Sequence, residues 1–264
     1  MLDKLSKALK SYAGSERKAV VGVHGDLYST AAAALCIKAL GAERTECVFT
    51  AVRQDDEQPA VTEALAGLGA LIRIVAVGEL ISELSYRCFY TDVHSCMEAI
   101  GERRSLVEWS VLRYMADCIG GFVVNPVTFD HRMLGEITAA DRLADLAPFW
   151  KRHAGEVWSL AKEMGVRKYA LDKIVDPDMV ERLGCDLRDA EAVANKFNDC
   201  DYFDEHGNFV CIHTEKWPSR VTVKTARGWV PKTLSKEEAA VVRAHNKGLP
   251  LIRNLSLDML DYDT

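Results

Sequence analysis

The sequence has no CxxC pair, no apolar run near the roughly 20 residues that a membrane span needs, and no excess of positive charge. Its 264 residues carry a formal net charge of −6. Because domains that bind nucleic acid nonspecifically are usually basic, this charge argues against such a partner. The first residues lack the uninterrupted apolar core of a signal peptide. These absences predict a cytoplasmic protein with no membrane and no nucleic-acid partner.

The eight cysteines are scattered at irregular spacing, mostly in apolar stretches, which is typical of reduced thiols and not of a disulfide framework. One group has the residue types of a zinc site: Cys200, His206, Cys211 and His213. Its spacing matches no standard zinc pattern, and the segment alternates like a hairpin around "DEHGN". The alternation favours a plain hairpin, with a metal site as the alternative.

The residues that are present indicate a globular α/β protein. With 48% hydrophobic and 27% charged residues, the composition suits one large domain or two small ones. Residues 2–13 have apolar side chains at helical spacing and predict an amphipathic helix. Strand and helix patterns then alternate, which predicts a doubly wound parallel sheet with strands at 19–23, 46–52 and 71–77 and helices at 29–40 and 59–70.

The second half of the chain extends this sheet and then changes in character. A helix at 105–120 precedes a fourth strand at 121–126, and ligands in such sheets bind at the carboxyl ends of the strands. The loops after Val23, Phe49 and Val124 are therefore expected to face one crevice. We predict an α/β domain over residues 1–197 and a small C-terminal element over 198–264, made of β hairpins and a helix.

The turn after the first strand is the main candidate site. A helix predicted to begin at Ser29 or Thr30 offers free backbone N–H groups and a partial positive charge, which suit phosphate. Ordinary structural roles are the alternative, with Asp26 as a turn or cap residue and Tyr28 as a packing residue. His24 has the same alternative, as a partly buried, hydrogen-bonded side chain.

Three segments carry a family resemblance. They are "VVGVHGDLYSTAAAALCIKALG" at 20–41, "NPVTFDHRMLGEIT" at 125–138 and "DLAPFWKRHAGEVWSLAKEMGV" at 145–166. In this order they resemble the ammonia-dependent NAD synthetases of the N-type ATP pyrophosphatase superfamily, over roughly residues 1–185. The resemblance implies the adenine nucleotide alpha hydrolase-like fold, ATP and magnesium as cofactors, amide formation through an adenylated carboxylate, and a homodimer.

The departures from the family pattern concentrate where its chemistry takes place. In the SGGxDS motif, which wraps the pyrophosphate of ATP, His24 replaces the first Ser, Asp26 the second Gly and Tyr28 the Asp. The family's nucleotide-binding Thr falls at Pro126, its metal-binding Glu at His131 and its phosphate-binding Lys at Ala154. A carboxylate in place of glycine is unfavourable next to phosphate, both sterically and electrostatically.

From this pattern we predict a divergent or repurposed nucleotide-binding protein of NAD synthetase type. If it is an enzyme, the expected reaction is ATP-dependent amide formation. Two alternatives stay open: an inactive homologue that acts as a binding or structural subunit, and a metal-dependent hydrolase or nucleotide sensor. The expected ligands are a nucleotide or a small carboxylate, with ATP and a divalent metal as cofactors.

The residue predictions follow from the same alignment. The catalytic candidates are Asp130, His131 and Asp145, and the metal candidates are Asp26 and His131. Nucleotide contacts are predicted for a set of residues in the first turn and in the loop after the second strand: His24, Gly25, Asp26, Tyr28, Ser29, Thr30 and Arg53.

Overall fold

The computed structural model describes residues 1–52, 58–89, 97–133 and 137–167, together with strands at 211–214, 217–225, 228–233 and 258–259. The chain divides into two compact units. The first comprises Met1–Thr128, Thr138–Ile174 and Leu255–Thr264, and the second comprises Phe129–Ile137 and Val175–Asn254. This division differs from the boundary expected between residues 197 and 198, which stays a prediction.

A parallel sheet forms the centre of the first unit. Its strand order is β3-β2-β1-β4-β5-β9, and each pair of neighbouring strands is parallel. The order confirms the predicted α/β class, and β1, β2 and β4 are neighbours whose carboxyl ends lie at one edge, as expected. The strands are β1 (Ala19–Gly22), β2 (Thr45–Ala51), β3 (Ile72–Ala76), β4 (Phe122–Val124), β5 (Leu146–Ala147) and β9 (Asp258–Met259).

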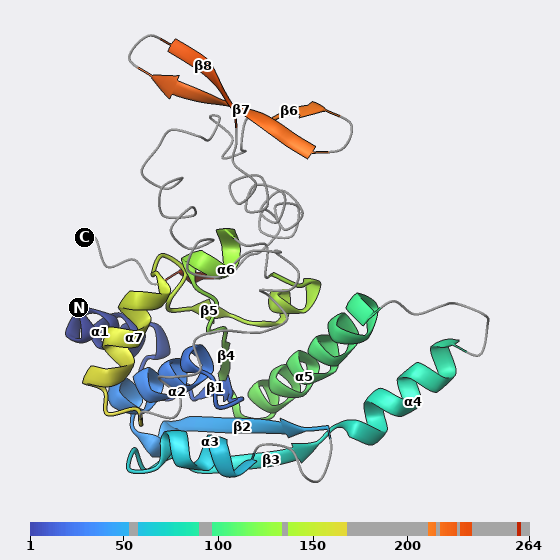
Figure 1. The fold of residues 1–264 in the computed structure, drawn as a ribbon. Coiled ribbons are helices and arrows are strands. Elements are labelled where there is room, and N and C mark those ends of the chain that lie inside the picture. Colours follow the sequence, from blue (N-terminus) through green and yellow to red (C-terminus); the bar gives the residue numbers. More distant parts are fainter. Residues whose placement is uncertain are drawn as a thin grey trace. The chain divides into compact units, whose positions relative to one another are not determined.

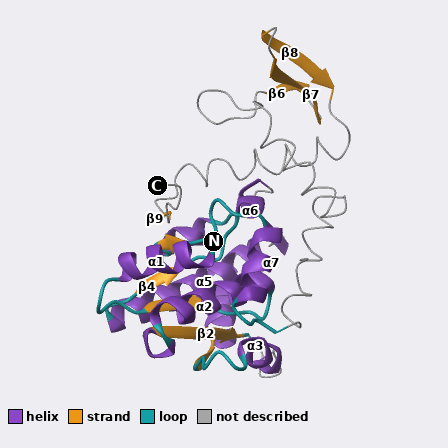
Figure 2. Ribbon diagram, turned by 90° about the vertical axis from the view of Figure 1, so that its left-hand side faces the viewer, coloured by secondary structure: helices purple, strands orange, loops and turns teal. Residues whose placement is uncertain are grey.

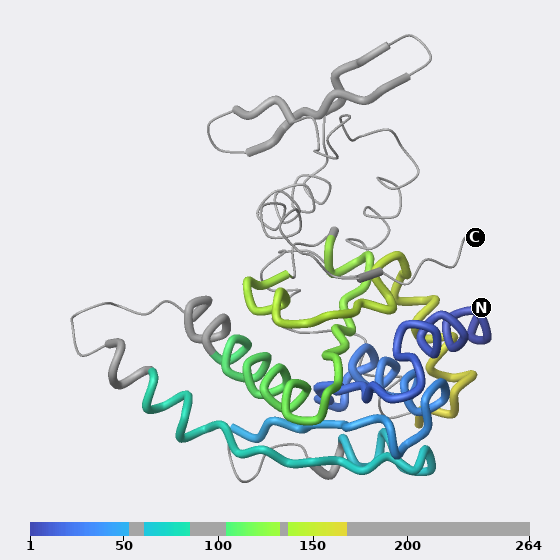
Figure 3. Tube along the Cα trace, turned by 180° about the vertical axis from the view of Figure 1, so that it is seen from behind, coloured from blue at the N-terminus to red at the C-terminus, as the bar shows by residue number. Residues whose placement is uncertain are grey.

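Helices cover both faces of this sheet, so the fold is doubly wound. Figures 1 and 3, seen from opposite sides, both show β1 and β4 running between α2 and α5, and in Figure 2 strand β2 lies among the helices. The described helices of the first unit are α1 (Leu2–Ala13), α2 (Leu27–Leu40), α3 (Gln58–Leu65), α4 (Gly78–Phe89), α5 (Met97–Ile119) and α7 (Ala154–Glu163), with 3-10 turns η1 (Ala42–Arg44) and η2 (Ala139–Leu143).

The main hydrophobic core lies between the sheet and α2. Successive strand residues point to opposite faces, and Val21, Cys47 and Phe122 are fully buried in one cluster with α1, α2 and α7. Helix α1 has the predicted bounds and buries its apolar stripe, and its Tyr12 meets the Phe122 ring edge-on at 5.1 Å. The residues from Ala31 to Ala34 of α2 are all buried. Because alanine side chains are small, they let α2 pack closely against its neighbours.

Helix α5 packs on the other face. A β-carbon at Gly22 would lie 2.9 Å from Leu112 Cδ1, so the glycine lets α5 approach β1 closely. The sequence predicted this helix only from residue 105, and it gave no prediction for α4, which covers 78–89.

The second unit contains α6 (Phe129–Met133) and a separate antiparallel sheet. Its strands are β6 (Cys211–Thr214), β7 (Trp217–Thr225) and β8 (Gly228–Thr233), in the order β6-β7-β8. These strands fall within the predicted small β element. The hairpin turn expected around "DEHGN" lies outside the described residues, as does the segment "SKEEAAVVRAHNKG" at 235–248, which carries the helix expected in the C-terminal element.

None of the helices in the described part of the chain is both long enough and apolar enough to span a bilayer.

Candidate functional site

The turn between β1 and α2 is built around Gly25. Gly25 is buried and has a φ of 79°, a left-handed conformation that favours glycine. The backbone N–H of the preceding His24 donates to Ser29 Oγ at 3.1 Å, which ties the end of the strand to the first turn of the helix. The imidazole itself is exposed, and a β-carbon at Gly22 would lie 3.8 Å from its Nε2.

Asp26 caps helix α2, as its structural alternative predicted, and Ser29 and Thr30 do not. Its backbone is extended, and its Oδ1 accepts the backbone N–H groups of Tyr28 at 2.8 Å and Ser29 at 2.9 Å. Its Oδ2 accepts a short hydrogen bond from the Ser29 hydroxyl. The helix therefore begins at Leu27, two residues before the predicted start, because the carboxylate satisfies the first amides.

These contacts place a negative charge where a bound phosphate would lie. The amides of Tyr28 and Ser29 are among the donors that an anion at this helix N-terminus would use, and both already donate to Asp26. The structure thus brings His24, Gly25, Asp26 and Ser29 together in one turn, where the Ser29 hydroxyl bonds to both the His24 backbone and the Asp26 carboxylate.

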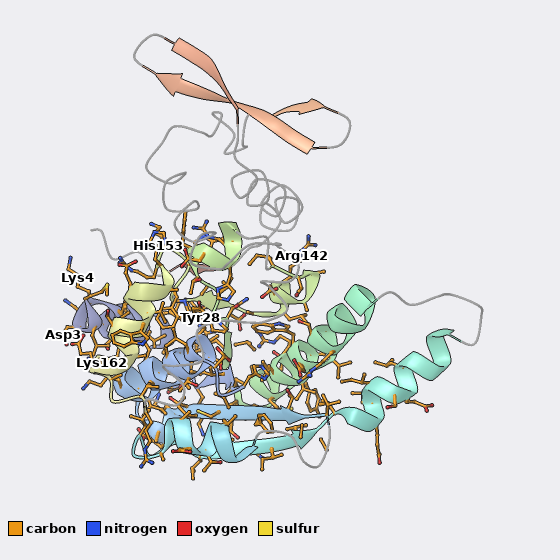
Figure 4. All side chains as sticks on the ribbon, viewed as in Figure 1. Asp3, Lys4, Tyr28, Arg142, His153 and Lys162 are labelled. Atoms are coloured by element: carbon orange, nitrogen blue, oxygen red, sulfur yellow. The ribbon has the colours of Figure 1, made fainter. Side chains whose placement is uncertain are left out.

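Two other predicted residues of the turn are partly or wholly inside the core. Tyr28, labelled in Figure 4, is half-buried and packs against the main hydrophobic cluster. Thr30 is fully buried, and its hydroxyl has no hydrogen-bond partner among the described residues. Thr30 offers no accessible surface to a ligand in this conformation. Arg53, predicted to contact the nucleotide, lies outside the described residues.

Asp145 connects three elements of the first unit. Its Oδ2 accepts from Arg113 Nη1 of α5 at 2.6 Å and from the backbone N–H of Val123 in β4 at 2.7 Å. Arg113 also pairs with Asp117 at 2.6 Å. Burial lowers the pKa of Arg113, but the hydrogen bonds to Asp117 and Asp145 outweigh it and raise the pKa. The carboxylate predicted to be catalytic is therefore part of a structural junction.

The other two catalytic candidates lie on α6, in the second unit. Asp130 is buried and His131 is half-buried. Their neighbour Arg132 lies over the Phe129 ring at 5.0 Å, and burial lowers its pKa to about 10, against the opposing effect of Asp130. The expected grouping of Asp130 and His131 with the turn after β1 stays a prediction.

A buried polar network at the end of β4 was not predicted from the sequence. Asn125 Nδ2 donates to Asp141 Oδ1 at 2.7 Å, and Asn125 Oδ1 accepts the backbone N–H of Val127 at 3.0 Å. The other oxygen of Asp141 accepts from the backbone and hydroxyl of Thr138 at 2.6 and 2.8 Å. The network fixes the loop at the carboxyl edge of the sheet. Its capping-box spacing, Thr138 to Asp141, was the sequence signal available.

A short basic run, Lys151, Arg152 and His153, precedes Ala154 at the start of α7. His153, labelled in Figure 4, is the N-cap, and its backbone carbonyl accepts the backbone N–H of Glu156 at 3.0 Å. Glu156 in turn accepts from the backbone N–H of His153 at 3.0 Å and pairs with Arg152 at 3.2 Å. The side chains thus stabilise the helix start at the position where the family has a phosphate-binding lysine.

Within the described ranges, no three His, Cys, Asp or Glu side chains lie close enough to hold a metal ion. Of the cysteine and histidine group, Cys211 and His213 lie on β6, and Cys200 and His206 lie outside the described residues. The metal roles suggested for Asp26 and His131 stay predictions.

An apolar groove of about 690 Å³ lies between α4 and α5, over β2 and β3. Several large apolar side chains of this region are strongly exposed, with Leu80 at 48%, Leu84 at 43%, Leu106 at 50% and Tyr114 at 70%. Glu46 and Arg73, which form an ion pair across β2 and β3, line its polar end.

Comparison with known proteins supports the resemblance drawn from the three segments. No family model matches the chain. A curated relative, the NH3-dependent NAD(+) synthetase of Thermoplasma acidophilum, is 26% identical over 160 residues. The match covers 60% of this chain and 65% of the relative, so it spans just under two thirds of the relative's own length.

Solved structures share the fold at low identity. An NMN synthetase from Francisella tularensis aligns over 93% of this chain and 90% of its own, with a TM-score of 0.67 and 16% identity. An NH3-dependent NAD synthetase from Campylobacter jejuni aligns over 78% of this chain and 87% of its own, with a TM-score of 0.62 and 15% identity. In fold, and in the part of its sequence that matches, the chain is therefore NAD synthetase-like.

Proposed function

We propose that this chain is a binding or structural subunit of NAD synthetase type that does not cleave ATP at the turn after β1. The observation that supports this proposal is the position of the Asp26 carboxylate, which accepts both first-turn amides. Asp26 stands where the family has a glycine. A phosphate group would have to displace this carboxylate and then lie beside its negative charge.

Two further positions support the same reading. At the start of α7, Ala154 stands where the family has a phosphate-binding lysine. His153 and Glu156 there bond to each other's backbone amides. At the end of β4, Pro126 has no hydroxyl and no backbone N–H to offer a nucleotide. A site that has lost these donors is poorly suited to the charge that develops during adenylation.

The test is whether ATP is bound and whether pyrophosphate is released. We expect no pyrophosphate from ATP, ammonia and deamido-NAD with magnesium or manganese, and no calorimetric binding of ATP tighter than about 1 mM, which corresponds to roughly 4 kcal/mol. Release of pyrophosphate coupled to amide formation would overturn the proposal and support the repurposed ligase.

Two matched variants of Asp26 separate charge from geometry. Asp26→Asn keeps a side-chain oxygen that can accept the amides but removes the negative charge, whereas Asp26→Gly removes both. If the carboxylate excludes phosphate, Asp26→Gly binds inorganic pyrophosphate about tenfold or more tightly than the natural chain, since one displaced charge in water is worth about 1 kcal/mol at 4 Å and more near protein. Equal binding by all three forms would show that the turn is outside the site.

We propose further that the subunit forms a homodimer through the α4/α5 groove. The family resemblance implies a homodimer, and a surface with leucines near half exposure is unusual for a monomer. A second copy of the chain would cover this apolar groove. The α4/α5 face is therefore the surface through which an inactive copy would retain partners.

A cytoplasmic setting is proposed on the thiols of the described residues. Cys36 and Cys47 are buried and not oxidised, and Cys118 is exposed as a free thiol. An exposed free thiol is typical of a reducing compartment.

A further inference from the structure

The apolar groove between α4 and α5 has one charged end. Glu46 of β2 and Arg73 of β3 line it there and form an ion pair. Arg73 is in register with Val48, which lies two residues after Glu46, so both charged side chains project from the same face of the sheet. The Glu46 side chain is 26% exposed and the Arg73 side chain 60%. Water therefore reaches the pair as long as the groove is open.

This ion pair uses only part of the hydrogen-bonding capacity of its two members. Arg73 donates to Glu46 Oε1 through its Nε. Within the described part of the chain, the terminal nitrogens of Arg73 and the second oxygen of Glu46 have no hydrogen-bond partner. A guanidinium can donate from all of its nitrogens, and a carboxylate can accept on both oxygens. Each member can thus bind a second group of opposite charge.

The polar side chains along the rest of the groove already have partners within α5. The Ser110 hydroxyl donates to the backbone carbonyl of Leu106 at 2.7 Å. A hydrogen bond to Cys118 raises the pKa of Tyr114. Among the described side chains that line the groove, the unused hydrogen-bonding capacity is therefore concentrated at its charged end.

Covering the groove removes water from this charged end. A charged group that loses water and gains no partner is strongly destabilising, so the protein that covers the groove has to supply groups of opposite charge. A second copy related by a two-fold axis presents the same surface, because such an interface is self-complementary. It therefore brings one carboxylate and one guanidinium to the charged end of the first copy.

We propose that Glu46 and Arg73 select a second copy of this chain as the partner of the α4/α5 groove by forming ion pairs across the two-fold axis. The proposal rests on the homodimer of the proposed function. Arg73 keeps its Nε on Glu46 of its own copy and donates from its terminal nitrogens to the partner's Glu46. The side chains, two from each copy, then alternate in charge, and charge-assisted hydrogen bonds join all of them.

The experiment reverses one charge at a time in the full chain. Glu46→Arg leaves only cations at the interface and Arg73→Glu leaves only carboxylates, so each variant is expected to raise the dissociation constant of the dimer by about tenfold or more. Light scattering over a dilution series measures this constant. An equimolar mixture of the two variants is expected to regain the dimer, which native mass spectrometry distinguishes from either homodimer by mass. Neither variant has an ion pair of its own, so this recovery reports contacts between copies.

The double variant Glu46→Arg/Arg73→Glu keeps an ion pair within each copy, with the two charges exchanged. It is expected to form a dimer with itself as tightly as the natural chain does. Mixed with the natural chain, it brings like charges together across the interface, so mixed dimers are expected well below their statistical share. This comparison decides the question if either single variant does not fold, as checked by circular dichroism.

The control variants make the same kinds of charge change on helix α1. Asp3 and Lys7 are exposed there, and α1 packs on the face of the sheet opposite to α5. Asp3→Arg and Lys7→Glu are each expected to form a dimer with the dissociation constant of the natural chain. A similar loss of dimer in these controls would overturn the proposal, because it would show a general effect of charge.

Two results separate the failure of this proposal from the failure of the proposed dimer. If the natural chain is a dimer and the mixture of single variants stays monomeric, or if the double variant mixes statistically with the natural chain, the ion pairs between copies are wrong and the dimer stands. If the natural chain is monomeric throughout the dilution series, the dimer and the ion pairs between copies are both wrong.

Discussion

At the scale of single residues, Asp26 determines the character of the turn after β1. Aspartate is favoured at an N-cap because its carboxylate accepts early helix amides and its charge interacts well with the helix dipole. Because the carboxylate accepts these amides and is negatively charged, it occupies the helix N-terminus as a bound anion would. Under the proposed function, the departure from glycine to aspartate exchanges a ligand contact for an internal one.

Asp26→Ala is expected to destabilise the protein by about 1 kcal/mol, within the range of about 0.5 to 2 kcal/mol measured for lost caps. Asp26→Asn, which retains the acceptor, is expected to stay within a few tenths of the natural value. Urea unfolding followed by circular dichroism measures both. An Asp26→Ala variant with the same free energy of unfolding as the natural chain would contradict the capping role.

The buried thiols give a residue-scale prediction on pH. Burial raises the pKa of Cys47 to about 12, and burial raises that of Cys36 as well, so both stay protonated in the fold. Only Cys118 of these three is exposed. Because the thiolate is the nucleophile, iodoacetamide at pH 8 is expected to leave Cys36 and Cys47 intact. Cys118 lines the α4/α5 groove, so it is expected to be labelled when that groove is uncovered, as in a Leu84→Glu/Leu106→Glu variant; peptide mass mapping reads both results.

The sign of the pH dependence follows from the same shifts. A thiol whose pKa is raised in the folded state contributes its full stability below the unfolded value of 9.0, and that contribution is lost as the pH rises from there towards about 12. The free energy of unfolding is thus expected to fall between pH 9 and pH 11. A Cys36→Ala/Cys47→Ala variant should show a smaller fall over this range, and an equal fall would contradict the assignment.

At the scale of elements, the contact between β1 and α5 depends on Gly22. A side chain there would meet Leu112, so Gly22→Val is expected to destabilise the protein by about 1 to 3 kcal/mol through overpacking. Leu112→Ala makes room for the valine. The loss in free energy of unfolding should therefore be smaller for the double variant than the sum of the losses in the two single variants, as a double-mutant cycle in urea would show.

A glycine in an open position provides the control for this experiment. A β-carbon at Gly155 in α7 would meet nothing within 4 Å. Gly155→Ala is therefore expected to leave stability unchanged or to raise it by up to about 1 kcal/mol.

Asp145 offers a test of structure against catalysis. Asp145→Ala leaves the backbone N–H of Val123 and the guanidinium of Arg113 without this acceptor, which is expected to cost about 1 to 3 kcal/mol. Asp145→Asn retains an oxygen and should recover part of the loss. Denaturant titration of the three forms measures the effect, and an unchanged free energy of unfolding for Asp145→Ala would contradict the junction.

The elements that local patterns determine could be predicted from the sequence. The alternation of apolar strands with helices predicted the parallel sheet, and the apolar spacing of α1 predicted its bounds. Helix α4 was missed although Leu80 and Leu84 have helical spacing, and much of its apolar surface stays exposed in this chain. A helix whose apolar residues stay partly exposed has a weaker apolar pattern in the sequence than a helix that packs into the core.

The site could be predicted only in part. The turn and its glycine follow from the strand-turn-helix pattern, but whether Asp26 faces a ligand or its own helix depends on backbone angles. The pairing of Arg113 with Asp145 joins residues 32 positions apart, which no local pattern reveals. Contacts of this kind are set by which elements the sheet makes neighbours.

At the scale of the whole molecule, the apolar groove predicts self-association. Leu84→Glu combined with Leu106→Glu introduces two charges into the α4/α5 face, where burial against a second copy would be costly. The natural chain of 29.3 kDa is expected to run at twice that mass in light scattering, and the variant at the monomer mass. A natural chain that is monomeric at tens of micromolar would contradict the proposed dimer.

The pairing of β5 with β9 has a consequence for how the protein is made. Strand β9 enters the first unit only after the segment Val175–Asn254 of the second unit has been synthesised. Until then β5 is an open edge, with unsatisfied backbone groups that other chains could pair with. During translation the ribosome-bound chain therefore exposes an unpaired strand edge that can associate with other chains. This edge is covered only when residues 258–259 have emerged and can pair with β5.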